Sequence, residues 1–116
     1  MPALNRLVIY TKKIDEMSAF YCEHFGYTAH IDPGDRIVEL RPTDGGAILM
    51  LHKAGKATKE GQVLVKLTFD VPDVTEFCAK CDIPFGKIHQ AEGYQFANAK
   101  DPAGNSISLS SRAFRV

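Results

Sequence analysis

LNRLVIYTKKIDEMSAFYCEHFG, residues 4–26, is the stretch that decides the fold. Its first part, residues 4–11, is rich in β-branched and aromatic side chains, which predicts a β-strand. From residue 14 to residue 25 the apolar side chains change to helical spacing, and Gly26 follows where a helix favours a left-handed last residue. The stretch therefore predicts a strand that leads directly into a helix.

The chain after this helix alternates between short apolar segments and turn residues. Three such segments predict strands, at residues 27–31, 36–41 and 47–52. Residues 53–61 (KAGKATKEG) show no hydrophobic periodicity, which predicts an exposed linker. The first half of the chain is therefore expected to contain one strand, one helix and three further strands.

The second half repeats this order. It predicts a strand, a shorter helix and three strands, at residues 63–71, 73–81, 86–90, 94–99 and 106–111. An offset of 60 pairs Arg6 with Lys66, and an offset of 58 pairs Leu49 with Ile107. Such pairing is typical of two units that bury a face together. We therefore expect one α+β domain over residues 1–116, with βαβββ modules at about 1–55 and about 62–116.

Composition limits the classes of function. Of the 116 residues, 45% are hydrophobic and 24% charged, which is a globular balance, and Lys plus Arg equal Asp plus Glu at 14 each. A neutral chain lacks the basic surface that non-specific nucleic-acid binding needs. It also has no apolar run long enough for a membrane span and no signal-peptide pattern at its start. We therefore expect a cytoplasmic protein that binds neither nucleic acid nor membrane, with its three cysteines reduced.

Three segments resemble the vicinal oxygen chelate superfamily, which includes glyoxalase I, bleomycin-resistance proteins and extradiol dioxygenases. The resemblance rests on residues 4–10 with the helix end at 20–27, on residues 67–74 (LTFDVPDV), and on residues 101–109 (DPAGNSISL). It implies that the eight strands form a curled mixed sheet, a cup, with the two helices on its outer face. It also implies a homodimer. Because one fold hosts many functions, it does not imply one activity.

Metal-dependent members of this superfamily bind a divalent ion through four strand positions. The resemblance places these positions at Arg6, Met50, Lys66 and Ser108, and the internal repeat independently pairs the first with the third and the second with the fourth. Arg has no lone pair to donate, protonated Lys repels a cation, and the Met thioether suits soft copper(I). We therefore expect no metal at this site and no other cofactor.

Strand alternation predicts which side chains share the inner face of the cup. Together with the four positions above, it gives a candidate ligand-binding set of Arg6, Tyr10, Met50, His52, Lys66, Asp70 and Ser108. Buried cations need a partner, and Asp70 is a candidate partner for one of them. The alternatives are a closed Arg–Asp–Lys network, cationic side chains whose tips extend to the solvent at the rim, or a cation that awaits an anionic ligand, such as a carboxylate or phosphate.

Other polar groups are weaker candidates. His52 is the one histidine predicted on the inner face, which makes it a candidate general base. Cys78 and Cys81 have CxxC spacing, but they fall late in a helix on its apolar stripe, where structural cysteines are the simpler interpretation.

Two functions of different classes remain open. The leading hypothesis is a metal-free protein that binds a small polar or anionic organic molecule. The alternative is an enzyme, either a metal-dependent lyase, dioxygenase or thiol transferase with a displaced metal site, or one that uses His52, Tyr10 and Asp70 for acid–base chemistry. A structural homodimer with a closed cup is a third interpretation.

Overall fold

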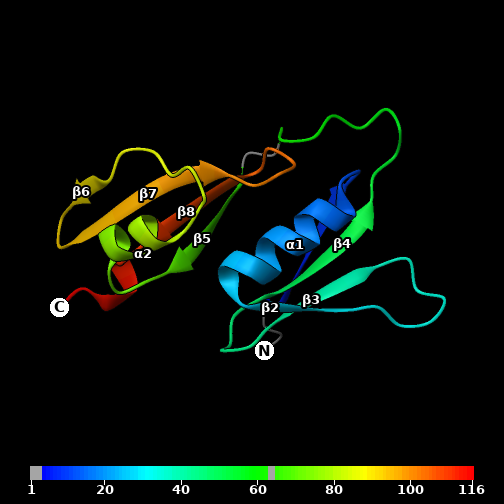
Figure 1. The fold of residues 1–116 in the computed structure, drawn as a ribbon, viewed down its shortest axis with the longest axis horizontal. Helices are drawn as coiled ribbons and strands as arrows, with labels where there is room; N and C mark the ends of the chain where they lie inside the picture. Colours follow the sequence, from blue (N-terminus) through cyan, green and yellow to red (C-terminus); the bar gives the residue numbers. More distant parts are fainter. Residues whose placement is uncertain (1–3, 63–64) are drawn as a thin grey trace. The chain divides into compact units, whose positions relative to one another are not determined.

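The computed structural model describes residues 4–62 and 65–116 (Figure 1). It divides into two compact units, Met1–Glu60 and Gly61–Val116, hereafter the first and the second module. Each module has the element order strand, helix and three strands. The predicted α+β class is confirmed, and so is the predicted βαβββ order of each module. Residues 63–64 of the predicted strand 63–71 lie outside the described residues.

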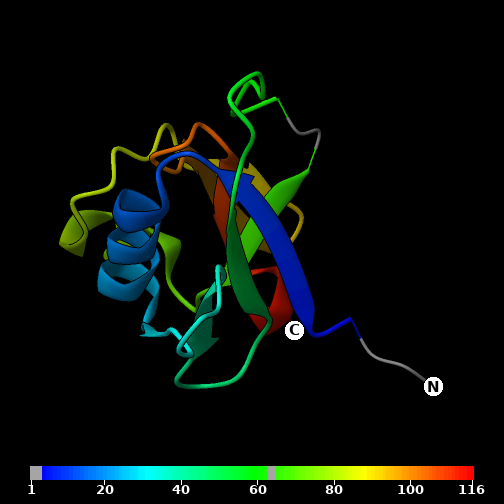
Figure 2. The same ribbon diagram turned by 90° about the vertical axis from the view of Figure 1, so that its right-hand side faces the viewer.

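The first module is a four-stranded mixed sheet with one helix. Its elements are β1 (Arg6–Thr11), α1 (Ile14–Phe25), β2 (Tyr27–His30), β3 (Val38–Pro42) and β4 (Ile48–Lys53). The strand order is β1-β4-β3-β2, with β1 and β4 parallel and the other pairs antiparallel. α1 lies against one face of this sheet (Figures 1 and 2). The crossover through α1 allows β1 to pair in parallel with a later strand.

The second module repeats this arrangement. Its elements are β5 (Lys66–Asp70), α2 (Val74–Lys80), β6 (His89–Ala91), β7 (Tyr94–Lys100) and β8 (Ser106–Ser110), followed by a 3-10 turn, η1 (Arg112–Phe114). The strand order is β5-β8-β7-β6, again with one parallel pair, β5 with β8. Positions in the two sheets can therefore be compared strand by strand.

The helix ends follow from local sequence. Gly26 ends α1 with a φ of 69°, and its N–H donates to the carbonyl oxygen of Tyr21, as the helical spacing and the glycine predicted. α2 begins after Asp73, whose side chain accepts from the N–H of Glu76. The buried side chains of α1 are Met17 and Tyr21. α1 is therefore held to its sheet by an apolar stripe, as amphipathic helices are.

Strand alternation separates a helix-facing side of each sheet from an open face. On the helix-facing side Leu49, Leu51, Ile107 and Leu109 are at most 2% exposed. The intervening residues of β1 and β5, such as Arg6 and Lys66, are exposed. The predicted alternation is thus confirmed along β1, β4 and β5, whereas all four residues of β8 from Ile107 to Ser110 are buried.

Some strands and loops differ from the sequence prediction. The strand expected at residues 86–90 is shorter and begins at His89. The segment predicted as an exposed linker is hydrogen-bonded to the end of β1. The Glu60 carboxylate accepts from the Thr11 hydroxyl, at 3.0 Å, and from the Lys12 N–H. Lys12 Nζ also donates to the carbonyl oxygen of Lys56 at 2.7 Å. Hydrophobic periodicity does not reveal such polar contacts, because they depend on the folded path of the chain.

Candidate functional site

In the first module the four predicted site residues lie on the open face. The register of β1 with β4 pairs Val8 with Met50 and Tyr10 with His52. The Tyr10 and His52 rings lie 5.1 Å apart between centroids. Arg6 Nη1 lies 3.8 Å from Met50 Sδ. The structure therefore brings Arg6 to Met50 and Tyr10 to His52.

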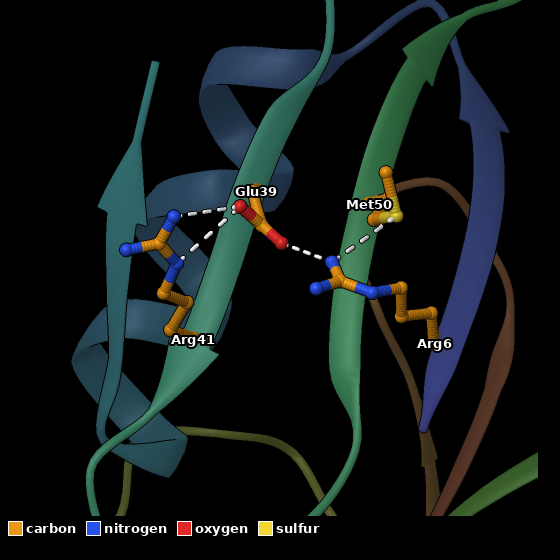
Figure 3. A network of polar contacts seen from close by, with 4 residues as sticks. All are labelled: Arg6, Glu39, Arg41 and Met50. Carbon is orange, nitrogen blue, oxygen red and sulfur yellow. Dashed lines mark hydrogen bonds and ion pairs between the residues drawn. The ribbon is translucent and has the colours of Figure 1, made fainter. Parts of the chain in front are cut away.

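The strongest electrostatic feature of this face is an ion-pair network around Glu39 (Figure 3). Arg6 Nη1 pairs with one carboxylate oxygen, and Arg41 Nη2 donates to the other at 2.9 Å. The hydrogen bond from Arg6 and then that from Arg41 lower the pKa of Glu39 below its ordinary value of 4.5. Glu39 is therefore ionised at neutral pH and offsets one of the two guanidinium charges.

His52 has a defined hydrogen-bond partner. Its Nδ1 lies 3.1 Å from the carbonyl oxygen of Lys53. A carbonyl can only accept, so this contact requires the hydrogen on Nδ1 and leaves Nε2 as the lone-pair atom of the neutral ring. The side chain can thus accept a hydrogen bond from a ligand, or a proton, through Nε2.

In the second module Lys66, Asp70 and Ser108 also lie on the open face. Lys66 Nζ donates to Asn98 Oδ1 at 2.9 Å. The register of β5 with β8 pairs Asp70 with Ser110 and Thr68 with Ser108. Ser108 is 4% exposed, and its hydroxyl donates to the carbonyl oxygen of Leu109 at 3.3 Å.

Asp70 is not paired with Lys66 in the second module. Lys66 Nζ donates to Asn98, and Asp70 makes no ion pair within the described residues of its own module, 61–62 and 65–116. Asp70 is the fourth residue after Lys66, which is about 13 Å along an extended strand. The Lys66–Asp70 contact of the Arg–Asp–Lys network is therefore not formed within this module.

The residues that sequence reasoning missed are Glu39, Arg41, Asn98 and Lys100. The internal repeat could have identified them, because an offset of 59 residues pairs Glu39 with Asn98 and Arg41 with Lys100. This offset lies between the 58 and 60 used for neighbouring strands. Alternation along β3 also places Glu39 and Arg41 opposite the buried Leu40.

The residues at the four family positions do not fit a divalent metal. The Arg6 guanidinium has no free lone pair, and Lys66 uses its Nζ as a hydrogen-bond donor. Within the two ranges that the structure describes, no three His, Cys, Asp or Glu side chains gather in an arrangement that could hold a metal ion. Positive side chains thus occupy two of the four places where a divalent ion would need anionic or neutral donors.

Cys78 lacks the lowered pKa that a redox CxxC motif needs. Cys78 and Cys81 are free thiols, and Cys81 Sγ lies 3.8 Å from the carbonyl oxygen of Cys78. Burial, and secondly the neighbouring Cys81, raise the pKa of the Cys78 thiol above its ordinary value. A raised pKa disfavours the reactive thiolate, which is the opposite of what a redox motif needs.

The comparisons with known proteins identify the family. A model of the Glyoxalase/Bleomycin resistance protein/Dioxygenase superfamily matches residues 3–109. The chain belongs to this superfamily. The resemblance seen in the three sequence segments is thereby confirmed. Membership in the glyoxalase superfamily accounts for the two βαβββ modules, but the superfamily includes proteins of different function.

Solved structures of the glyoxalase superfamily share this fold. Lactoylglutathione lyase from Agrobacterium tumefaciens is 22% identical, with a TM-score of 0.69 over 93% of this chain and 92% of that one. TnmS3, an antibiotic binding protein from Streptomyces sp. CB03234, is 19% identical, with a TM-score of 0.75 over 94% of each chain. A superfamily member from Sphaerobacter thermophilus DSM 20745 is 18% identical, with a TM-score of 0.73 over 95% and 97%. Identities this low show the fold alone.

No curated protein matches the chain. Among the described residues, no helix is long and apolar enough to cross a membrane.

Proposed function

We propose that this chain is a metal-free small-molecule-binding protein of the glyoxalase and bleomycin-resistance type, and that it takes a small polar or anionic organic ligand. The observation that carries the proposal is the Arg6–Glu39–Arg41 network beside Met50. At a position where metal-dependent relatives are expected to place a ligand, this chain has a guanidinium fixed by a carboxylate. A cation held in this way opposes the binding of a divalent ion.

The open faces offer the groups that a small-molecule site needs. They combine apolar surface, such as Val8, Ile48 and Met50, with a few polar groups that can orient a ligand. Of the predicted ligand-binding residues, Tyr10 is 59% exposed, and His52 keeps Nε2 as an acceptor. Lys66 and Asp70 are exposed on the second sheet. These groups suit a ligand that carries both an apolar part and a charged group.

A thermal-shift screen tests the proposal. Purified protein is heated with Mn²⁺, Ni²⁺ or Zn²⁺ and, separately, with a panel of small carboxylates and phosphates. We expect stabilisation by at least one anion and none by the metals, since only a ligand that binds the native state raises its melting temperature. Elemental analysis of the protein as purified is the matched control. Strong stabilisation by a metal with none by any anion, or one tightly held divalent ion per chain, would contradict the proposal.

The same screen addresses the enzyme alternative. A metal-dependent lyase, dioxygenase or thiol transferase with a displaced site requires a tightly bound ion, and elemental analysis reports it directly. The predicted homodimer remains a prediction, and light scattering at micromolar concentration checks it.

A further inference from the structure

We propose that the open face of the second module holds an oxyanion site, formed by Lys66, Asn98, Lys100 and Ser106, for the carboxylate or phosphate group of the ligand. This inference rests on the proposed function and names the part of the chain that binds the charged group.

The proposed site consists of two adjacent rows of side chains that run across β5, β8 and β7. The registers of β5 with β8 and of β7 with β8 align Lys66, Ser106 and Lys100 in one row. They align Thr68, Ser108 and Asn98 in the next row. Neighbouring strands lie about 4.8 Å apart, so the two lysine Cα atoms are roughly 10 Å apart and both side chains can reach one small group above β8.

The hydrogen bonds in these rows leave donors for a ligand. Lys66 Nζ donates to Asn98 Oδ1 at 2.9 Å, and Lys100 Nζ donates to Ser106 Oγ at 3.0 Å. An ammonium group can only donate hydrogen bonds, so Lys66 uses the oxygen of Asn98 and Lys100 uses the oxygen of Ser106. The Asn98 Nδ2 hydrogens and the Ser106 hydroxyl hydrogen therefore remain for other partners. Both ammonium groups keep further hydrogens as well. The four side chains can therefore supply several donors to an oxyanion.

The six side chains of the two rows carry a net positive charge. They include two lysines and no carboxylate. Asp70 lies two pleats from Lys66 on the same strand. Asp101 follows Lys100, but it is 4% exposed and accepts hydrogen bonds from the N–H groups of Ala103 and Asn105 in its own turn. An entering anion would find charge-assisted donors, which bind more strongly than neutral ones.

The first module provides an internal comparison. Its equivalent positions are Arg6, Glu39 and Arg41, and there the acceptor between the cations is a carboxylate instead of an amide. Glu39 already fills the role that a bound anion would take. The repeat therefore predicts one oxyanion site, on the second module, and a counterpart on the first in which Glu39 offsets one of the two positive charges.

A chemical-shift titration with inorganic phosphate at constant ionic strength tests the site in the full chain. In the wild type we expect phosphate to move the Asn98 side-chain amide signals and the backbone signals of residues 106–108. Acetate should bind more weakly, because a dianion gains from two ammonium groups. Lys100→Gln should weaken phosphate binding by at least about tenfold. The matched control is Lys87→Gln, which removes the same charge from an exposed residue of the second module outside its strands and should leave the affinity unchanged.

Ser106→Ala provides a milder second variant, expected to weaken binding about threefold or more while the dispersion of the spectrum reports an intact fold. Phosphate that leaves the Asn98 amide signals unmoved would overturn the site, as would equal losses of affinity in Lys100→Gln and Lys87→Gln. If organic anions still bind in that case, the proposed function stands without this site. If no anion of the panel binds, the proposed function falls as well.

Discussion

Arg6 reaches across β4 to pair with Glu39 on β3, and Lys66 reaches across β8 to bond Asn98 on β7 in the same way. The two contacts occupy equivalent places in the two modules. They differ in the acceptor, which is a carboxylate in one and an amide in the other. This difference makes the net positive charge of the contacts lower in the first module than in the second.

Glu39→Asn should create a second oxyanion site on the first module. The substitution gives this module the amide found at Asn98, and it leaves Arg6 and Arg41 without a carboxylate between them. Titration with phosphate should then move signals of β1 and β3 as well as those of β7. We expect the new site to be weaker, because Ile48 stands where the second module has Ser106. If the β1 and β3 chemical shifts stay unchanged, the Glu39 carboxylate is not the group that prevents anions from binding to this face.

The contribution of Glu39 to stability should depend on pH. Because its pKa is lowered in the folded protein, the ion pairs stabilise the native state fully above the ordinary carboxyl pKa of 4.5. That stabilisation is lost as the pH falls below 4.5 through the lowered pKa. Urea denaturation of the wild type and of Glu39→Gln, from pH 7 to pH 3, should give curves that converge at the acid end. A constant difference across this range would exclude the titration of Glu39 as its cause.

Asp101 should be the most sensitive polar residue of the second module. One carboxylate oxygen accepts from the N–H groups of Ala103 and Asn105, and the other accepts from the Asn105 side chain at 3.1 Å. Asp101→Ala leaves these buried donors without an acceptor and should lower the free energy of unfolding by roughly 2–4 kcal/mol. Asp101→Asn keeps one oxygen for the two backbone donors and should cost less. Equal losses for the two variants, measured by urea denaturation, would argue against this role.

Cys78 should react slowly with iodoacetamide. Its raised pKa reduces the thiolate fraction at pH 8, and only the thiolate is an efficient nucleophile. Peptide mapping by mass spectrometry should show a rate for Cys78 well below that of the same residue in urea-unfolded protein. A native rate equal to or above the unfolded one would reopen the redox interpretation of the CxxC pair.

Sequence patterns predicted the elements better than their contacts. Helix α1 was predicted at its observed bounds, since helical spacing and Gly26 both mark it. Alternation correctly placed Arg6 and Lys66 on the face opposite the buried leucines. Alternation predicts on which face of the sheet a side chain lies, but it does not predict which residue that side chain contacts. The partner of Arg6 lies on a strand two places away in the sheet, which only the strand order reveals.

The alternation of side chains between the two faces of β4 and β8 affects how such a protein can evolve. Leu49 and Leu51 stabilise the module from one side of β4, while Ile48, Met50 and His52 face the other side. On β8 Ile107 and Leu109 alternate with Ser106, Ser108 and Ser110 on the other side of the strand, where Ser108 and Ser110 are also buried. Stability and ligand preference are thus encoded by alternate residues of one strand. A duplicated module can therefore acquire new binding specificity by substitution at every second position, without disturbing the residues that keep it folded.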